Sequence, residues 1–205
     1  RGNGGGHLTE ATGLTGLFID TGPVVQLRDT SGRVEVLPDP VPSVAYAGPL
    51  VVLVDRFSAS ASEIFTAAIQ DYHRGIVIGQ QTFGKGTVQN LYPLDQYARR
   101  QTEPGLGQLT LTIGKFYRVT GGSTQNKGVV PDIALPSGVD PDEVGENSRE
   151  GALPWDQINA TRFRAAGPLD SAIAYLTQHE VERMQSDPDV RYLLADIEAV
   201  AQLRS

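Results

Sequence analysis

Hydrophobic positions along this chain follow two periodicities, one typical of strands and one typical of helices. Short apolar runs at Val24–Leu27, Pro49–Val54 and Ile76–Ile78 have the length and composition of β-strands. The run at Pro49–Val54 is apolar at nearly every position, which predicts a strand buried on both faces. Apolar and polar residues alternate between Gly107 and Val119, which predicts a further strand.

Apolar residues recur at helical spacing in two segments of the same region, Leu8–Phe18 and Ala59–Tyr72. The second segment is expected to bury one face, made of Ile64, Phe65, Ala68 and Ile69. Strands and helices in succession indicate an α/β domain over residues 1–137.

The composition changes after Pro136. Residues 138–152 are acidic and polar, which predicts a linker or an extended arm. Helical spacing returns from Pro168, and Asp187 followed by Pro188 supplies a cap and a first-turn proline for a second helix. We therefore expect residues 138–205 to form an acidic linker and a helical C-terminal extension that packs against the core.

The net charge of the chain is −7, with 17 Lys and Arg against 24 Asp and Glu in 205 residues. No basic run is present, so the clustered cations that nucleic-acid binding needs are missing, and we expect no nucleic-acid partner. No apolar run approaches the roughly 18 residues that span a bilayer. The chain begins at Arg1 without an initiator Met, which leaves targeting and membrane association open.

Cysteine and histidine usage narrows the chemistry further. The chain has no cysteine, which excludes thiol catalysis and Cys-ligated zinc. Its three histidines, His7, His73 and His179, are scattered without metal-ligand spacing, so no metal site is expected.

Two short segments carry the candidate chemistry. Ser58–Glu63, with serines at 58, 60 and 62, opens the helix predicted at 59–72, and Phe83–Gln89 follows about two dozen residues later. A hydroxyl at a helix N-terminus lies near the positive end of the helix dipole and free N–H groups, which favour an alkoxide and an oxyanion. Serine with lysine suffices for nucleophilic acyl transfer without histidine. Helical rotation separates the three serines, and the residues alone do not choose among them.

Each segment also has a structural explanation. Ser60 and Glu63 have the spacing of an S-x-x-E capping box. Lys85 lies between two glycines, as a solvated lysine in a turn would. A lysine acts as a base only in its neutral form, and its ordinary pKa of about 10.4 must then be lowered by desolvation. On an extended strand Lys85, Thr87 and Gln89 share one face, so the Gln89 amide is placed to hold the amine.

Two glycine-containing segments suggest phosphate or anion binding. Gly79–Lys85 matches the G-x-x-x-x-G-K start of a phosphate-binding loop. Gly86 stands where that loop needs Ser or Thr, and Thr87–Leu91 has the pattern of a strand rather than the required helix, so a nucleotide-binding protein is only an alternative. Asn3–Gly6 is suited either to an oxyanion hole or to a flexible terminus.

In combination and in order, these segments resemble the C-terminal processing peptidases. The matching segments are Arg1–Gly6, Gly48–Glu63, Thr82–Gln89, Lys115–Arg118 and Gly121–Ile133. Ala152–Asp156 and the helices after it resemble the long-form, tail-specific members of Gram-negative bacteria. The resemblance implies a crotonase/Clp-protease-like α/β core of mixed sheet and helices, a periplasmic location, and an upstream PDZ domain, so the core is expected to be incomplete at its N-terminus.

The resemblance also implies roles for individual residues. It places the nucleophile on Ser60, the general base on Lys85 and the lysine-orienting glutamine on Gln89. Thus it selects one serine where the residues alone left three.

The oxyanion hole is implied in the same way. Its donors would be the backbone N–H of Ala61 and that of Gly5 or Gly6. Asp71 matches an acidic position of the family, and about three helical turns separate it from Ser60, so we assign it a structural role.

The expected function is that of a serine endopeptidase that cuts proteins recognised through an apolar C-terminal tail, with no metal or nucleotide cofactor. The resemblance also implies a periplasmic lipoprotein adaptor with helical repeats as a partner. The alternative is an inactive peptide-binding scaffold of the same fold. Intact Ser60, Lys85 and Gln89 count against that alternative.

Overall fold

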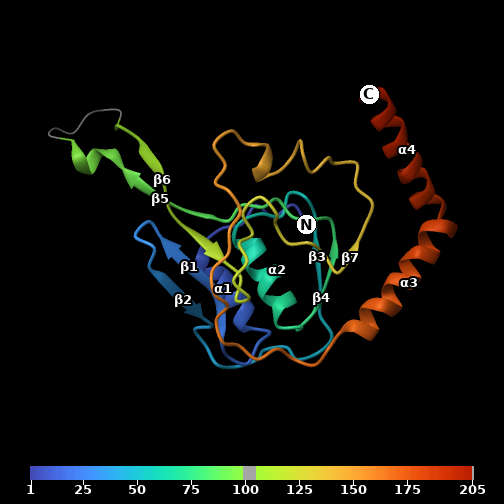
Figure 1. The fold of residues 1–205 in the computed structure, drawn as a ribbon, viewed down its shortest axis with the longest axis horizontal. Helices are drawn as coiled ribbons and strands as arrows, with labels where there is room; N and C mark the ends of the chain where they lie inside the picture. Colours follow the sequence, from blue (N-terminus) through green and yellow to red (C-terminus); the bar gives the residue numbers. More distant parts are fainter. Residues whose placement is uncertain (99–104, 205) are drawn as a thin grey trace.

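The computed structural model describes residues 1–98 and 105–204, and it contains two β-sheets with helices between and beside them (Figure 1). The strands are β1 (Pro23–Asp29), β2 (Val34–Pro38), β3 (Val51–Val54), β4 (Ile76–Gly79), β5 (Thr87–Pro93), β6 (Gln108–Tyr117) and β7 (Ile133–Ala134). The α-helices are α1 (Leu8–Gly16), α2 (Ala61–Asp71), α3 (Asp170–Ser186) and α4 (Pro188–Arg204), and short 3-10 turns occur at Leu94–Tyr97 and Glu146–Ser148.

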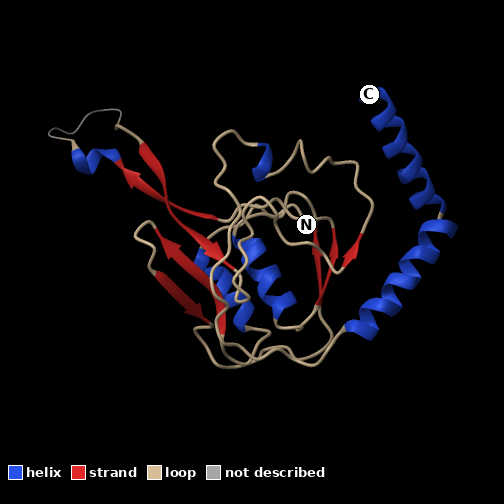
Figure 2. Ribbon diagram, viewed as in Figure 1, coloured by secondary structure: helices blue, strands red, loops and turns tan. Residues whose placement is uncertain are grey.

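The two sheets differ in strand direction. One has four antiparallel strands in the order β2-β1-β6-β5, and the other has three parallel strands in the order β3-β4-β7. Helices α1 and α2 lie between the sheets, while α3 and α4 form an arm beyond β7 (Figure 2). The mixed α/β architecture with a helical C-terminal region confirms the fold class expected above.

Helix α2 forms the centre of the core. Its apolar side is buried against α1, β1 and β4 and consists of Ala61, Ile64, Ala67, Ala68 and Ile69. From the four-stranded sheet, Val24, Val25 and Phe116 complete this core, each no more than 2% exposed. The position and tilt of α2 are therefore fixed from both sides, and its N-terminus carries the serine cluster.

The helices and strands predicted from periodicity are all present, with shifts of a few residues at their ends. The prediction that Pro49–Val54 is buried on both faces is wrong. Strand β3 pairs only with β4 at the edge of its sheet, which leaves Val51 50% and Leu53 55% exposed. Strands β2 and β7 were not predicted, because one is a short exposed hairpin strand and the other has two residues.

The C-terminal region begins with irregular chain that lies against the core, where Glu146 is only 8% exposed. Asp187 caps α4, since its carboxylate accepts the N–H of Asp189 at 2.9 Å, and Val190 is buried beside it. No helix within residues 1–98 and 105–204 is both long and apolar enough to cross a membrane.

The burial of α2 leads to a stability prediction. Ile69 is fully buried, so Ile69→Ala is expected to lower the free energy of unfolding by about 2 to 5 kcal/mol through lost burial and a residual cavity. Leu203→Ala is the control, because Leu203 is 87% exposed and its loss should cost no more than about 0.5 kcal/mol. Urea unfolding of the intact protein measures both, and equal losses would contradict the placement of α2 at the centre.

Candidate active site

Ser60 occupies a tight connection between strand β3 and helix α2. Its φ of 58° and ψ of −118° are rare for a residue with a side chain, so the surrounding structure holds the backbone under strain. A strained serine between a strand and a helix presents its hydroxyl next to the unpaired N–H groups of the first helical turn. Of the S-x-x-E capping box predicted from the sequence, the Glu63 half is formed here, since the Glu63 carboxylate accepts the Ser60 N–H at 2.7 Å.

The other two serines of the cluster serve the local structure. Ser58 is 2% exposed, and its hydroxyl donates to the Asp55 carboxylate at 3.2 Å. The Ser62 hydroxyl donates to the carbonyl of Asn3 at 2.9 Å. Backbone strain thus distinguishes Ser60 from its neighbours, a signal that the sequence alone does not contain.

The glycine-rich segment at residues 3–6 packs directly on residues 58–61, which we call the serine turn. The Asn3 carbonyl accepts the N–H of Ala59 at 3.0 Å. Gly5 has a φ of +98°, and a Cβ there would lie 2.9 Å from Ser60 Cβ and 2.8 Å from the nitrogen of Ala61. Only glycine permits this approach.

The two glycines proposed as oxyanion donors differ in their partners. The Gly5 N–H donates to the Asn3 side chain at 3.0 Å. Gly6 follows Gly5, and both line a cavity of about 300 Å³ together with Ala61 and Ser62. The predicted oxyanion donors therefore share one cavity, whose lining includes neither Ser60 nor Lys85.

Lys85 lies in the loop between β4 and β5, residues 80–86, which we call the lysine loop. Its side-chain nitrogen Nζ donates to the Gln89 side-chain oxygen Oε1 at 3.0 Å, so the amine is held from strand β5. Gly84 has a φ of +93°, and a Cβ there would lie 2.8 Å from the carbonyl carbon of Asn126. The glycine before the lysine is thus required by a close backbone approach.

Glu63 links the serine turn to the lysine loop. Its side chain is fully buried, and its two oxygens accept four hydrogen bonds, from Ser60 N–H (2.7 Å), Gly84 N–H (2.7 Å), Lys85 N–H (3.0 Å) and the Thr82 hydroxyl (2.5 Å). One carboxylate therefore fixes the backbone of the candidate nucleophile and that of the candidate base. The sequence indicated only the capping contact of Glu63, because its other partners lie 19 to 22 residues further along the chain.

The same burial changes the acidity of this group. Burial raises the pKa of the Glu63 carboxyl from 4.5 to about 7, against the opposing effect of its four hydrogen bonds. Glu63 therefore changes its charge near neutral pH.

Asp71 lies at the opposite end of α2 from Ser60. Its carboxylate is 5% exposed and pairs with the Arg118 guanidinium at 2.5 Å. Through this pair α2 is tied to the chain after β6, a contact that concerns the fold rather than the reacting groups.

The structure also bears on the phosphate-binding loop considered above. Gly79–Lys85 is followed by strand β5, so the helix that a phosphate-binding loop requires is not there. In the part of the chain that the structure describes, no cluster of His, Asp and Glu has the arrangement of a metal site.

The raised pKa of Glu63 predicts a pH dependence of stability. Between pH 4.5 and 7 the folded state binds the Glu63 proton more tightly than the unfolded state does, so this contribution is complete below about pH 4.5 and is lost as the pH rises through about 7. Relative to Glu63→Gln, the free energy of unfolding of the wild type should fall by about 3 kcal/mol from pH 4.5 to 8. Denaturant titrations of both proteins at several pH values measure this change. A difference in free energy of unfolding that stays constant between pH 4.5 and 8 would contradict the raised pKa of Glu63.

Comparison with known proteins gives two family matches. Residues 1–135 match the model of peptidase family S41, and residues 139–205 match the C-terminal domain of tail specific protease. The chain is 49% identical over 198 residues to the tail-specific protease of Haemophilus influenzae, and the matched region makes up 92% of this chain and 28% of that protein. It is 36% identical over 134 residues to the carboxy-terminal-processing protease of Bartonella bacilliformis, covering 65% of this chain and 29% of that protein.

A solved structure agrees with these matches. The photosystem II D1 C-terminal processing protease superposes with a TM-score of 0.55 at 32% identity, over 69% of this chain and 33% of that one. The chain thus spans less than a third of the curated relatives named above. The family model, the sequence identity and the shared fold show that the chain belongs to peptidase family S41, with residues 139–205 similar to the C-terminal domain of tail-specific protease.

Proposed function

We propose that this chain is the catalytic core of a serine endopeptidase in which Ser60 is the nucleophile and Lys85 the general base. The observation that carries the proposal is the Glu63 carboxylate, which accepts the N–H of Ser60 and the N–H of Lys85. These bonds hold the serine turn and the lysine loop against the same carboxylate. The strained backbone of Ser60 gives independent support.

The reaction follows from the groups at this site. Lys85, in its neutral form, takes the proton of the Ser60 hydroxyl as Oγ attacks the scissile carbonyl carbon. Gln89 Oε1 accepts from the lysine amine and so directs its lone pair. Protonated Lys85 then gives its proton to the leaving amine. Water, activated by Lys85, releases the acyl group from Ser60 by the same route.

The oxyanion would be stabilised by two backbone N–H groups. Ala61 is the first residue of α2, and the N–H at this position has no acceptor within the helix. Of the two glycines, Gly6 is the better donor, since the Gly5 N–H already bonds to Asn3. The role of Gly5 is then to allow the close approach to Ser60.

The substrates, location and partners are inferred from the relatives. Two related proteins are called tail-specific and carboxy-terminal-processing proteases. We propose that the substrates here are proteins presented by an apolar C-terminal tail, that the protein acts in the periplasm, and that a lipoprotein adaptor with helical repeats delivers substrates. No metal or nucleotide takes part in the proposed reaction.

A substrate with an apolar C-terminal tail tests the proposal in the intact protein. Ser60→Ala and Lys85→Ala should each lower kcat by about 10³-fold or more, because each removes a group that acts in the transition state. Ser186→Ala is the control, since its hydroxyl donates to the Glu182 carbonyl within α3 at 2.8 Å. EDTA and ATP should have no effect.

Each alternative has its own outcome in this experiment. Cleavage that persists in Ser60→Ala or disappears with EDTA would contradict the serine–lysine site. A requirement for ATP would favour the nucleotide-binding alternative. A wild type that binds the tail without cutting it would identify a peptide-binding scaffold.

A further inference from the structure

The lysine loop has a second support besides Glu63, and it comes from the start of the C-terminal domain. The side chain of Arg56, in the turn after β3, is 2% exposed and donates to three backbone carbonyls. One belongs to the lysine loop, Thr82 at 2.5 Å, and the others belong to the C-terminal region, Pro141 at 2.7 Å and Val144. The guanidinium therefore joins the two segments.

Glu146 adds a second link between the same segments. Its N–H donates to the Phe83 carbonyl at 3.0 Å. Its side chain accepts a 3.4 Å bond from Gln125, whose own oxygen accepts the N–H of Gly86 at 2.9 Å. The loop is thereby held on both sides of Lys85 by groups that contact the C-terminal region.

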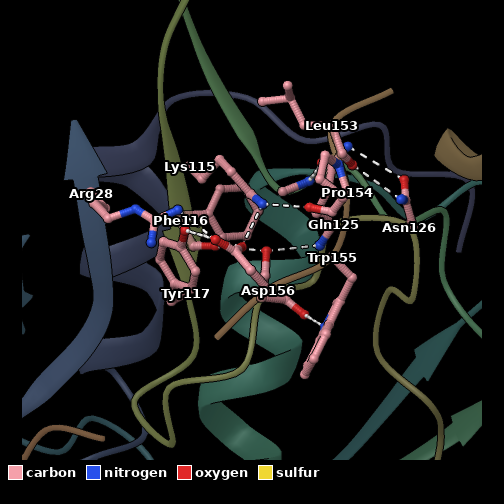
Figure 3. Close-up of polar contacts among 12 residues, drawn as sticks. Arg28, Lys115, Phe116, Tyr117, Gln125, Asn126, Leu153, Pro154, Trp155 and Asp156 are labelled. Carbon is pink, nitrogen blue, oxygen red and sulfur yellow. Dashed lines mark hydrogen bonds and ion pairs between the residues drawn. The ribbon is translucent and has the colours of Figure 1, made fainter. Parts of the chain in front are cut away.

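A separate cluster anchors the C-terminal region a few residues later (Figure 3). The Asp156 carboxylate accepts from Arg28 and Lys115, both at 2.5 Å, and so ties the segment to strands β1 and β6. Nearby, the Asn126 amide donates to the Leu153 carbonyl at 3.0 Å. These bonds attach the chain that follows residues 141–147 to the core, and so limit how far residues 141–147 can move away from the lysine loop.

An arginine is well suited to this position. Its planar guanidinium offers five donors in a fixed geometry, whereas a lysine has a single nitrogen and cannot reach the three separated carbonyls. Burial lowers the pKa of Arg56, and the charges of Glu63, Asp142 and Asp140 oppose this. A Cβ at Gly145 would lie 2.1 Å from Arg56 Nη2, so a glycine there makes room for the guanidinium.

We propose that Arg56 is a positioning residue for the catalytic lysine, through which residues 141–147 of the C-terminal domain hold the Lys85 loop in its working geometry. The proposal rests on the function proposed above. On this account the C-terminal domain is part of the active site, and loosening its contact with the loop slows the chemical step without weakening substrate binding.

The test compares Arg56→Lys with Arg74→Lys in the intact protein. Arg74 is the control, because it is half-buried and also donates to three backbone carbonyls, those of Phe18, Tyr46 and Gly48, none of which belongs to the lysine loop. Arg56→Lys is expected to lower kcat about 10- to 100-fold with KM within about twofold, since small displacements of a catalytic group cost rate rather than affinity. Arg74→Lys should lower Tm but leave kcat within about twofold, with every assay run well below Tm.

A second variant tests the same contact if Arg56→Lys does not fold. Gly145→Ala adds a methyl group against the Arg56 guanidinium, and it should reproduce the loss of kcat. Gly138→Ala is its control, because a Cβ there meets its nearest neighbour, Ile197, at an ordinary 3.6 Å.

The outcomes separate this inference from the proposed function. Wild-type kcat in a folded Arg56→Lys or Gly145→Ala variant would overturn the role of Arg56. An equal loss of kcat in Arg74→Lys would also overturn it, because general loosening would then explain the effect. Failure of the proposed function is recognised differently, by an inactive wild type or an active Ser60→Ala.

Discussion

The candidate site depends on one buried carboxylate. Glu63 has no exposed surface, and its two oxygens bind backbone N–H groups from the serine turn and from the lysine loop. A buried carboxylate without partners would destabilise the fold, so its four donors must stay in place together. The geometry that places Ser60 near Lys85 is therefore also a condition for folding.

Helix α2 transmits this constraint to the rest of the chain. Ser60 precedes its first turn, Glu63 lies within that turn, and Asp71 at its end pairs with Arg118. Both sheets pack on the helix, so the serine turn cannot shift without disturbing the core. The lysine loop receives further contacts from Arg56, through the Thr82 carbonyl, and from Glu146 of the C-terminal domain, through the Phe83 carbonyl.

The sequence predicted much of this arrangement. Periodicity located the helices and most strands, and the motifs around Ser60 and Lys85 identified the segments that the structure brings together. It did not predict the exposure of β3, because an apolar strand at a sheet edge reads like a central one. Nor did it reveal the linking roles of Glu63 and Arg56, whose partners lie far along the chain and are set by tertiary packing alone.

The most direct test of the central claim is the rate at which a fluorophosphonate probe labels Ser60 in Glu63→Gln. At pH 8 the wild-type carboxylate is ionised, whereas the amide presents an NH₂ group to at least one of the N–H donors that Glu63 now satisfies. If Glu63 aligns the serine with the lysine, labelling in the folded variant should be about 100-fold slower than in the wild type. Glu182→Gln, on the exposed surface of α3, should label at the wild-type rate. Labelling of folded Glu63→Gln within about twofold of the wild-type rate would contradict the account.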